Sequence, residues 1–168
     1  MAARSIARVT VPHARAARVA QLLNATEARY VIVGATAMQL WGSSRATRDI
    51  DILIDPTIEN ANRVLAALAE LPLGLARKLS AEELVSRGVT MIGDTPNVDV
   101  LTRAWNVKWE DANRDIVVFE VEGVPIPTIS LTLLIASKRT GRAQDTADIV
   151  VLEALRSLRA HRDRSADR

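Results

Sequence analysis

Apolar residues recur along the chain with two different periods, which predict short strands intermingled with amphipathic helices. The run Tyr30–Val33 is wholly apolar and stops at Gly34, and Ile50–Ile54 continues a stretch in which aspartate and isoleucine alternate. From Thr57 to about Leu71 the apolar positions follow the helical period instead. Further strands are predicted over residues 88–92, 97–101 and 115–122, and further helices over 11–23, 35–41, 130–140 and 143–159.

Capping and turn residues predict where individual elements begin and how they are joined. Ser80 is followed three residues later by Glu83, the spacing of a capping box, so a short helix is expected there. Gly123 marks a turn, and Pro125 and Pro127 predict that the next strand lies at an edge of the sheet, because proline has no N–H to donate. The order of elements favours an α/β (α+β) class, a mixed β-sheet covered by helices, over a doubly wound parallel sheet.

The composition limits the organisation and the chemistry of the chain. A length of 168 residues predicts a single domain, with a core over about 28–128, C-terminal helices over about 130–160 and a basic tail over 161–168. The absence of cysteine excludes disulfide scaffolds, thiolate zinc sites and cysteine nucleophiles. The two histidines, His13 and His161, lie near opposite ends, which disfavours a histidine metal site. Catalysis must therefore rest on carboxylates, hydroxyls, lysine and arginine.

The formal net charge of +2 conceals an uneven distribution. Residues 1–18 contain four arginines and no acidic residue, and residues 156–168 contain five arginines against two aspartates. The body between them carries a formal charge of −5. Basic ends of this kind are either solvated termini or contacts for a polyanion such as nucleic acid. No apolar run approaches the roughly 20 residues that cross a bilayer, and a cytoplasmic location is expected.

Three aspartates in strand-like contexts are the strongest chemical signal. Asp49 and Asp51 are two positions apart, so on a strand their side chains project from the same face. Asp99 stands between two valines, although aspartate is depleted in strands. Adjacent carboxylates repel each other, and a divalent cation such as Mg²⁺ or Mn²⁺ relieves that repulsion. If the two strands are neighbours, the sequence predicts a three-carboxylate site suited to metal-assisted phosphoryl transfer; an exposed polar strand face is the alternative.

Three sequence elements, in this order, resemble the nucleotidyltransferase superfamily with its polymerase-β-like fold. They are the turn Gly34-Ala35-Thr36-Ala37, the segment Arg45-Ala46-Thr47-Arg48-Asp49-Ile50-Asp51, and the series Lys138, Arg142, Asp145 and Asp148. The likeness spans about residues 30–155 and is greatest to the AbiEii-type nucleotidyltransferases of toxin–antitoxin systems. It implies a nucleotidyltransferase fold with C-terminal helices and a metal-dependent enzyme that moves an NMP group from an NTP to an acceptor hydroxyl.

The resemblance also implies roles for individual residues. Asp49, Asp51 and Asp99 would be the catalytic residues and the Mg²⁺ ligands. The triphosphate would be held by the cofactor-binding residues Gly34, Ala35, Thr36, Arg45 and Lys138. Transfer RNA is the first acceptor to consider, a cognate toxin or antitoxin protein is a possible partner, and no membrane association is implied. A small-molecule acceptor, as in antibiotic nucleotidyltransferases, and a plain nucleic-acid-binding module are the alternatives.

Ala35 departs from the family pattern, in which a second glycine or a serine occupies this position. It adds a methyl group where phosphate approaches the backbone and supplies no hydroxyl. A degenerate member that binds nucleotide or a partner without transfer, such as an antitoxin, is therefore a further alternative. Thr36 could supply the missing hydroxyl.

Other polar and aromatic residues have structural explanations as well as functional ones. Arg45 and Arg48 either contact phosphates or neutralise the neighbouring aspartates. Asp145 is expected to pair with Arg142, and Asp148 with Arg139 or with the site. Among the tryptophans, Trp41 is predicted to anchor the core, whereas Trp105 and Trp109 could form an exposed patch for a partner or a base.

Overall fold

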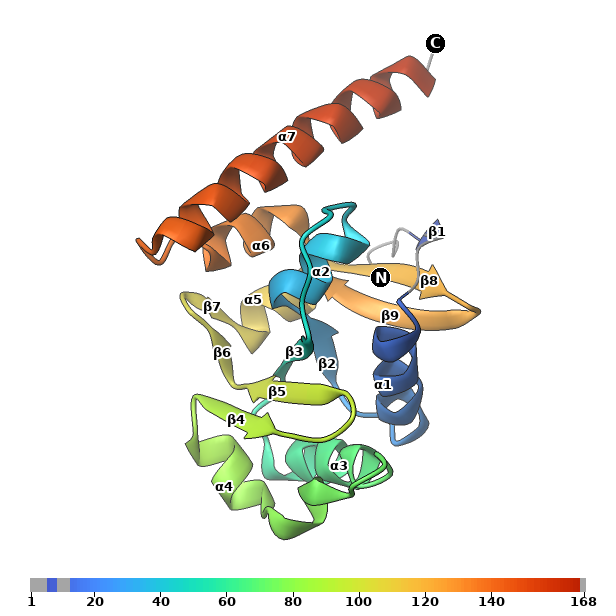
Figure 1. The fold of residues 1–168 in the computed structure, drawn as a ribbon, viewed down its shortest axis with the longest axis vertical. Helices are drawn as coiled ribbons and strands as arrows, with labels where there is room; N and C mark the ends of the chain where they lie inside the picture. The colour runs from blue at the N-terminus through green and yellow to red at the C-terminus, as the bar shows by residue number, and fades with distance from the viewer. Residues whose placement is uncertain (1–5, 9–12, 167–168) are drawn as a thin grey trace.

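The computed structural model describes residues 6–8 and 13–166, which form a seven-stranded mixed sheet covered by helices (Figure 1). The strands are β1 (Ile6–Arg8), β2 (Tyr30–Ile32), β3 (Asp49–Ile54), β4 (Val89–Ile92), β5 (Asn97–Leu101), β8 (Ile116–Val121) and β9 (Val124–Ile129), with a separate hairpin of β6 (Arg103–Ala104) and β7 (Val107–Lys108). The helices are α1 (Ala14–Ala25), α2 (Gly34–Leu40), α3 (Ile58–Leu68), α4 (Ala81–Ser86), α5 (Trp109–Arg114), α6 (Leu131–Ser137) and α7 (Ala143–Ala166), with a 3-10 turn η1 (Leu75–Lys78).

The sheet has the order β1-β8-β9-β2-β3-β5-β4, and its directions are mixed. Strand β3 is antiparallel to β2 on one side and parallel to β5 on the other. Strand β4 closes one edge of the sheet as an antiparallel neighbour of β5. The predicted α/β class with a mixed sheet is therefore confirmed.

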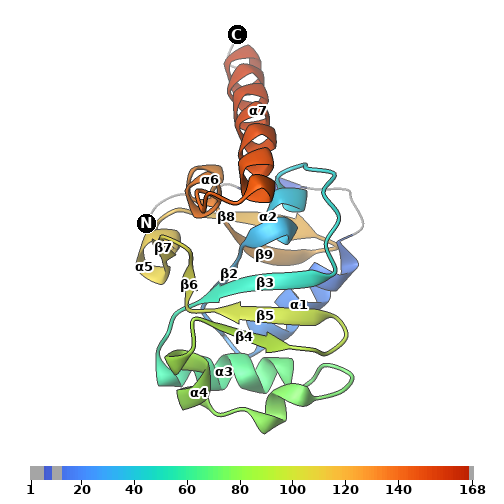
Figure 2. The same cartoon turned by 60° about the vertical axis from the view of Figure 1, so that its left-hand side comes forward.

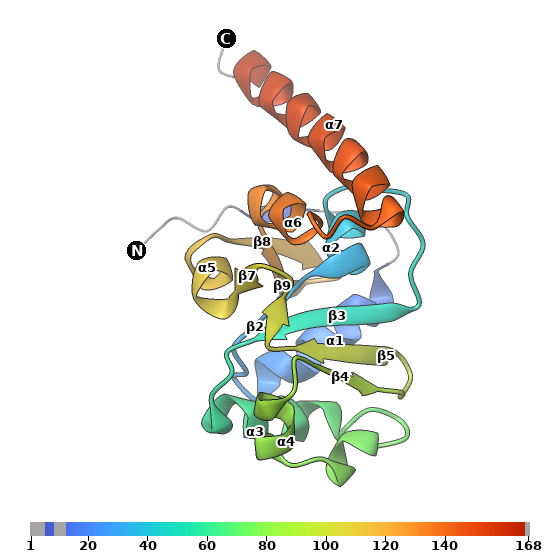
Figure 3. The same cartoon turned by 90° about the vertical axis from the view of Figure 1, so that its left-hand side faces the viewer.

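The core lies between the sheet and its helices. Helices α1 and α3 lie on one face, and α2 lies over the other, with α6 and α7 beyond it (Figures 1 and 3). Strand β3 is fully buried over Ile52–Ile54, and α3 contributes Val64 and Leu68 to the same core. Each large aliphatic side chain buried in this way contributes about 1.5–3 kcal/mol to folding, which fixes the position of β3 firmly.

The predicted cap at Ser80 begins α4 as expected, whereas the ends of several helices differ from the prediction. The capping box at Ser80 and Glu83 is present, with both of its hydrogen bonds. Helix α3 ends at Leu68 and α6 at Ser137, both earlier than expected. Helix α7 continues to Ala166, because no glycine or proline interrupts the sequence after residue 143.

Strand β9 contradicts the prediction of an edge strand, because it lies between β8 and β2. Strand β9 pairs with β2 only at Thr128, which lies opposite Ile32. Pro125 and Pro127 therefore lie where β9 has no pairing with β2. The carbonyl of Pro125 instead accepts a hydrogen bond from Asn24 Nδ2 at 2.9 Å. The prolines are tolerated because this half of the strand has an open side, as an edge strand has.

The predicted basic tail is part of a helix in the structure. The second half of α7 extends away from the rest of the molecule (Figures 1 and 2). Where α7 leaves the body, the Arg159 guanidinium lies 4.7 Å from the centre of the Trp41 ring. The expected helix start at Val11, the side chains of the first basic residues and residues 167–168 lie outside the described part. None of the helices within residues 13–166 combines the length and apolar character that crossing a membrane requires.

Asp94 holds the loop that leads into β5. Its side chain is buried and accepts hydrogen bonds from the backbone N–H groups of Leu73 at 2.9 Å, Leu75 at 3.2 Å and Thr95 at 2.7 Å. Burial alone would raise the pKa of Asp94, but these backbone donors stabilise the carboxylate and hold its pKa below the ordinary value. The ionised form of Asp94 therefore stabilises the fold.

We expect Asp94→Ala to lower the free energy of unfolding by about 3 kcal/mol, because backbone donors would lose a charged acceptor. Since the folded pKa is lowered, this contribution is present above the ordinary aspartate pKa and is lost as the pH falls through the folded pKa. Urea unfolding at pH 7 and at acidic pH measures both effects. A difference between variant and wild type that persists unchanged on acidification would contradict this role.

Candidate active site

Two neighbouring parallel strands bring the predicted aspartates together. Asp51 of β3 pairs in register with Asp99 of β5, and Asp49 pairs with Asn97 one repeat earlier. Because side chains two positions apart share a face, all four project from the same side of the sheet. Asn97 Nδ2 donates a hydrogen bond to Asp49 Oδ1 at 3.0 Å. The parallel pairing of β3 with β5 thus brings Asp51 and Asp99 together, as the sequence predicted if the two strands are neighbours.

The turn at Gly34 is fitted to Asp51. The N–H of Val33 donates to the carbonyl of Asp51 at 2.9 Å, so β2 ends beside this residue. Gly34 has φ +62°, and a Cβ placed there would lie 2.1 Å from Asp51 Oδ2. The backbone N–H of Ala35 donates to the Asp51 carboxylate. Glycine is therefore required here both by the backbone conformation and by the approach of a carboxylate.

The aspartates perturb one another electrostatically. Burial, followed by repulsion from Asp99 and Asp49, raises the pKa of Asp51 to about 6, although Lys138 acts in the opposite direction. Burial and repulsion from Asp49 also raise the pKa of Asp99. A hard divalent cation bound between such carboxylates would relieve their mutual repulsion. Within residues 6–8 and 13–166, however, no group of three or more acidic, histidine or cysteine side chains is arranged so that it could hold a metal ion.

A hollow of about 600 Å³ opens beside Asp51, which is within the usual size of small-molecule sites. Gly34 and Ala35 line it next to this carboxylate. The basic side chains in its wall are Arg45, Arg103, Lys138 and Arg142. Asp145 also lines the hollow, so its wall combines two carboxylates with four cations. A wall of this charge is suited to a ligand that carries several negative charges together with a bound cation.

Three of these basic residues, Arg45, Lys138 and Arg142, form ion pairs with the buried acids Asp145 and Asp148, which differs in part from the predictions. The Lys138 side chain is only 12% exposed, and its Nζ lies 3.2 Å from Asp145 and 2.9 Å from Asp148. It is therefore a largely buried cation held between two acids. The predicted pair of Arg142 with Asp145 is present at 2.8 Å.

Asp148 does not pair with Arg139 as one alternative had it. Its carboxylate contacts Lys138 and Arg45, so the guanidinium of Arg45 neutralises an acid of α7 rather than the β3 aspartates. Although burial opposes it, these hydrogen bonds hold the pKa of Asp148 below its ordinary value. The C-terminal helix is thereby tied to the segment that precedes β3.

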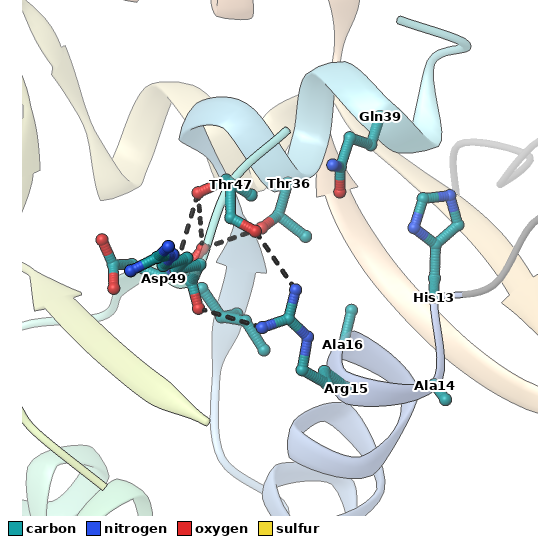
Figure 4. A pocket seen from close by; sticks show the side chains of 10 residues that line it. His13, Ala14, Arg15, Ala16, Thr36, Gln39, Thr47 and Asp49 are labelled. Carbon is teal, nitrogen blue, oxygen red and sulfur yellow. Dashed lines mark hydrogen bonds between the residues drawn. The ribbon is translucent and has the colours of Figure 1, made fainter. Parts of the chain in front are cut away.

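A second, smaller hollow of about 100 Å³ lies behind the start of β3 (Figure 4). Thr36 Oγ1 and Thr47 Oγ1 both donate to the carbonyl of Asp49, at 3.2 and 3.1 Å. The Arg15 guanidinium holds the carbonyl of Thr47 at 3.1 Å. The hydroxyl of Thr36 is therefore engaged in the fold, and the carboxyl group of Asp49 points away from His13 (Figure 4).

The three tryptophans occupy different environments. Trp41 anchors the core as predicted: its ring meets Phe119 edge-on, with centroids 5.0 Å apart, and its Nε1 donates to the carbonyl of Ile129. Trp109 is buried, whereas Trp105 is 58% exposed. The predicted joint patch of Trp105 and Trp109 is therefore wrong, because only Trp105, at the tip of the β6–β7 hairpin, is exposed.

Some residues of the site were not singled out from the sequence. Asn97 precedes Asp99 by two positions, so the alternation of β5 was a signal that could have placed it on the same face. Arg103 lines the hollow from the β6–β7 hairpin. No local pattern marks Arg103, because its place in the site depends on how a long-range hairpin folds back.

Comparisons with known proteins match the fold rather than the sequence. No protein-family profile matches the chain, and neither does any curated sequence. An antigenic nucleotidyltransferase-like protein from Paracoccidioides brasiliensis superposes with a TM-score of 0.57 at 16% identity, over 84% of this chain and 75% of that one. A candidate nucleotidyltransferase from Thermotoga maritima gives a TM-score of 0.47 at 16% identity, over 90% of each chain. The superposition on the Paracoccidioides protein shows that the chain has a nucleotidyltransferase-like fold.

Proposed function

We propose that the protein is a Mg²⁺-dependent nucleotidyltransferase that moves an NMP group from an NTP to an acceptor hydroxyl. The observation that carries this proposal is the register of β3 and β5, which sets Asp51 opposite Asp99 beside the Gly34 turn. The nucleotidyltransferase-like fold supports it. The AbiEii-type specialisation is part of the proposal and rests on the sequence motifs.

The carboxylates and cations have distinct roles in the proposed reaction. Asp49, Asp51 and Asp99 would hold Mg²⁺ or Mn²⁺, which neutralises charge on the triphosphate when bound. The Gly34–Thr36 backbone, with Lys138 and Arg45, would bind the phosphates. An acceptor oxygen forms a bond to the α-phosphorus, the bond from that phosphorus to the β-phosphate oxygen breaks, and pyrophosphate leaves. Asp99, whose pKa is raised by burial and by Asp49, takes the hydroxyl proton.

Transfer of label is the test of this proposal. The protein is incubated with each α-labelled NTP, Mg²⁺ and total tRNA, and the RNA is separated from the free nucleotide. Label should appear on the RNA and vanish in the Asp49→Ala/Asp51→Ala double variant. A second arm with small hydroxylated acceptors distinguishes an RNA substrate from a small-molecule one. Binding of NTP without label on any acceptor would contradict the enzymatic proposal.

A nucleotide-binding protein without transferase activity is a second candidate. The placement of Asp49 favours it, because its carboxylate already accepts a hydrogen bond from Asn97 Nδ2 and Asp49 is not among the residues that line the larger hollow. Ala35 in the lining of the larger hollow favours it as well, because alanine supplies no hydroxyl to a phosphate. Such a protein would bind NTP and a cognate toxin or antitoxin partner in place of turning the nucleotide over.

The projecting end of α7 is the proposed contact for an RNA acceptor. Removing residues 156–168 would also take Arg159 from Trp41, so we choose Arg162→Gln/Arg164→Gln, which changes two exposed side chains. We expect weaker binding of tRNA, with a salt dependence shallower by about one to two units, and unchanged binding of NTP. Filter binding over a salt series measures this. An unchanged slope would show that the helix end does not contact RNA.

A further inference from the structure

The β6–β7 hairpin presents a large aromatic side chain to solvent. Trp105 follows β6 at the tip of this hairpin and is 58% exposed. Its backbone has φ +55°, a left-handed conformation that few non-glycine residues adopt. The other two tryptophans are each only 7% exposed. An exposed tryptophan in an unfavourable backbone conformation contributes little to folding.

Trp105 lines the same 600 Å³ hollow as Asp51. The two sides of the hollow come from different parts of the fold. Strand β3, the Gly34 turn and the junction of α6 with α7 supply one side, which holds the carboxylate and Lys138. Strands β4 and β5 and the hairpin supply the other side, where the lining residues are Gly88, Val89, Leu101, Arg103, Ala104 and Trp105. Figure 3 shows the hairpin rising from the end of β5 towards α6.

The two sides differ in chemistry. The first is charged, whereas the second combines an exposed indole ring with the apolar side chains of Val89 and Leu101 and a single guanidinium at Arg103. A ligand that fills both sides must carry anionic groups at one end and a flat apolar ring at the other. Aromatic rings of bases stack on tryptophan with offset geometry, and arginine beside such a platform contributes its own planar face.

We propose that Trp105 is the platform on which the base of the nucleotide stacks, while the phosphates lie against the Gly34 turn and Lys138. This inference rests on the proposed function, since it assigns the base-binding side of the same site. Stacking does not depend on hydrogen bonds to the edge of the base. Trp105 therefore binds purines more tightly than pyrimidines, because a purine overlaps a larger area of the indole ring. Trp105 acts in binding and does not touch the reacting phosphorus.

Two ligands separate the base from the phosphates in the test. Isothermal titration with Mg²⁺-ATP measures both sides of the site, and titration with Mg²⁺ and inorganic tripolyphosphate measures the phosphate side alone. The variants are Trp105→Ala and Trp105→Phe, with Leu158→Ala as a control, since Leu158 is 64% exposed on α7 and outside the hollow. Circular dichroism confirms that each variant is folded.

We expect Trp105→Ala to weaken ATP binding at least about fivefold, with the affinity for tripolyphosphate unchanged. Trp105→Phe should recover most of the loss, and Leu158→Ala should match the wild type. ATP binding that is unchanged in Trp105→Ala overturns the platform, and so does an equal loss for ATP and tripolyphosphate. Wild-type protein that binds neither ligand overturns the proposed function itself, and this is seen before any variant is made.

Discussion

Asp51→Asn is expected to abolish nucleotide transfer and, at the same time, to make the protein more stable at pH 7. Loss of activity follows because the amide removes a charge from the proposed cation site. Groups that only support metal ligands already contribute about 10–100-fold, so we expect transfer to fall by more than about 100-fold. The labelled-nucleotide assay measures it. Two opposite effects from one substitution identify a residue kept for function rather than for folding.

The gain in stability follows from the pKa of Asp51, which burial and the neighbouring aspartates raise to about 6 in the folded protein. Because the folded pKa lies above the ordinary value of 3.8, the favourable contribution of Asp51 is present below that value and is lost as the pH rises through about 6. At pH 7 the wild type carries the unfavourable charge, whereas the variant does not. At pH 7 the free energy of unfolding of Asp51→Asn should therefore exceed that of the wild type by about 1–3 kcal/mol, when both are measured in the presence of chelator. The difference should shrink towards pH 4.

Asp115→Asn is the matched control, because Asp115 is exposed at the end of α5, away from β3. It should leave both transfer and stability unchanged. Mg²⁺ should stabilise the wild type against heat and leave the melting temperature of Asp51→Asn unchanged. An Asp51→Asn protein that transfers nucleotide normally, or that is less stable than the wild type at pH 7, would contradict the assignment of this residue.

Gly34→Ala is expected to have the second large effect. The left-handed conformation at φ +62° costs an alanine about 1–2 kcal/mol. The added Cβ would also stand 2.1 Å from Asp51 Oδ2, so the carboxyl group or the turn must move. We expect a lower free energy of unfolding together with a loss of transfer of more than about 100-fold, because small displacements in a catalytic site are costly.

Gly123→Ala separates strain in the backbone from the collision with Asp51. Gly123 also has a positive φ, +78°, but a Cβ there would meet nothing within 4 Å. This variant should lose only the stability due to backbone strain, about 1–2 kcal/mol, and keep full transfer. If Gly34→Ala and Gly123→Ala affect transfer equally, the close approach of Gly34 to Asp51 has no functional role.

Much of the fold was predictable because its signals are local. The alternation around Asp49 and Asp51, the capping box at Ser80 and the turn at Gly123 each depend on a few neighbouring residues, and each predicted element is present. The position of β9 was not predictable from its prolines. Pro125 is tolerated in an interior strand because β2 does not pair with this half of β9, and its carbonyl accepts a hydrogen bond from Asn24, 101 positions away in sequence.

The candidate site shows the same division. The same-face relation of Asp49 and Asp51 follows from strand geometry, whereas the place of Asp99 beside Asp51 required the parallel pairing of β3 with β5. The cluster of Lys138, Arg45 and Asp148 could not be inferred, because it joins α6, the segment before β3 and α7. The spacing of residues in the sequence does not indicate which of several acidic residues will form an ion pair with a given lysine in the folded chain.

The central claim is that the aspartates of β3 and β5 bind a divalent cation together with a nucleotide. A crystal structure with Mn²⁺ and a non-hydrolysable ATP analogue, examined by anomalous diffraction, tests it most directly. The proposed function predicts an anomalous peak within about 2.2 Å of carboxylate oxygens of Asp51 and Asp99, beside the triphosphate. A bound nucleotide with no peak at these carboxylates would contradict it.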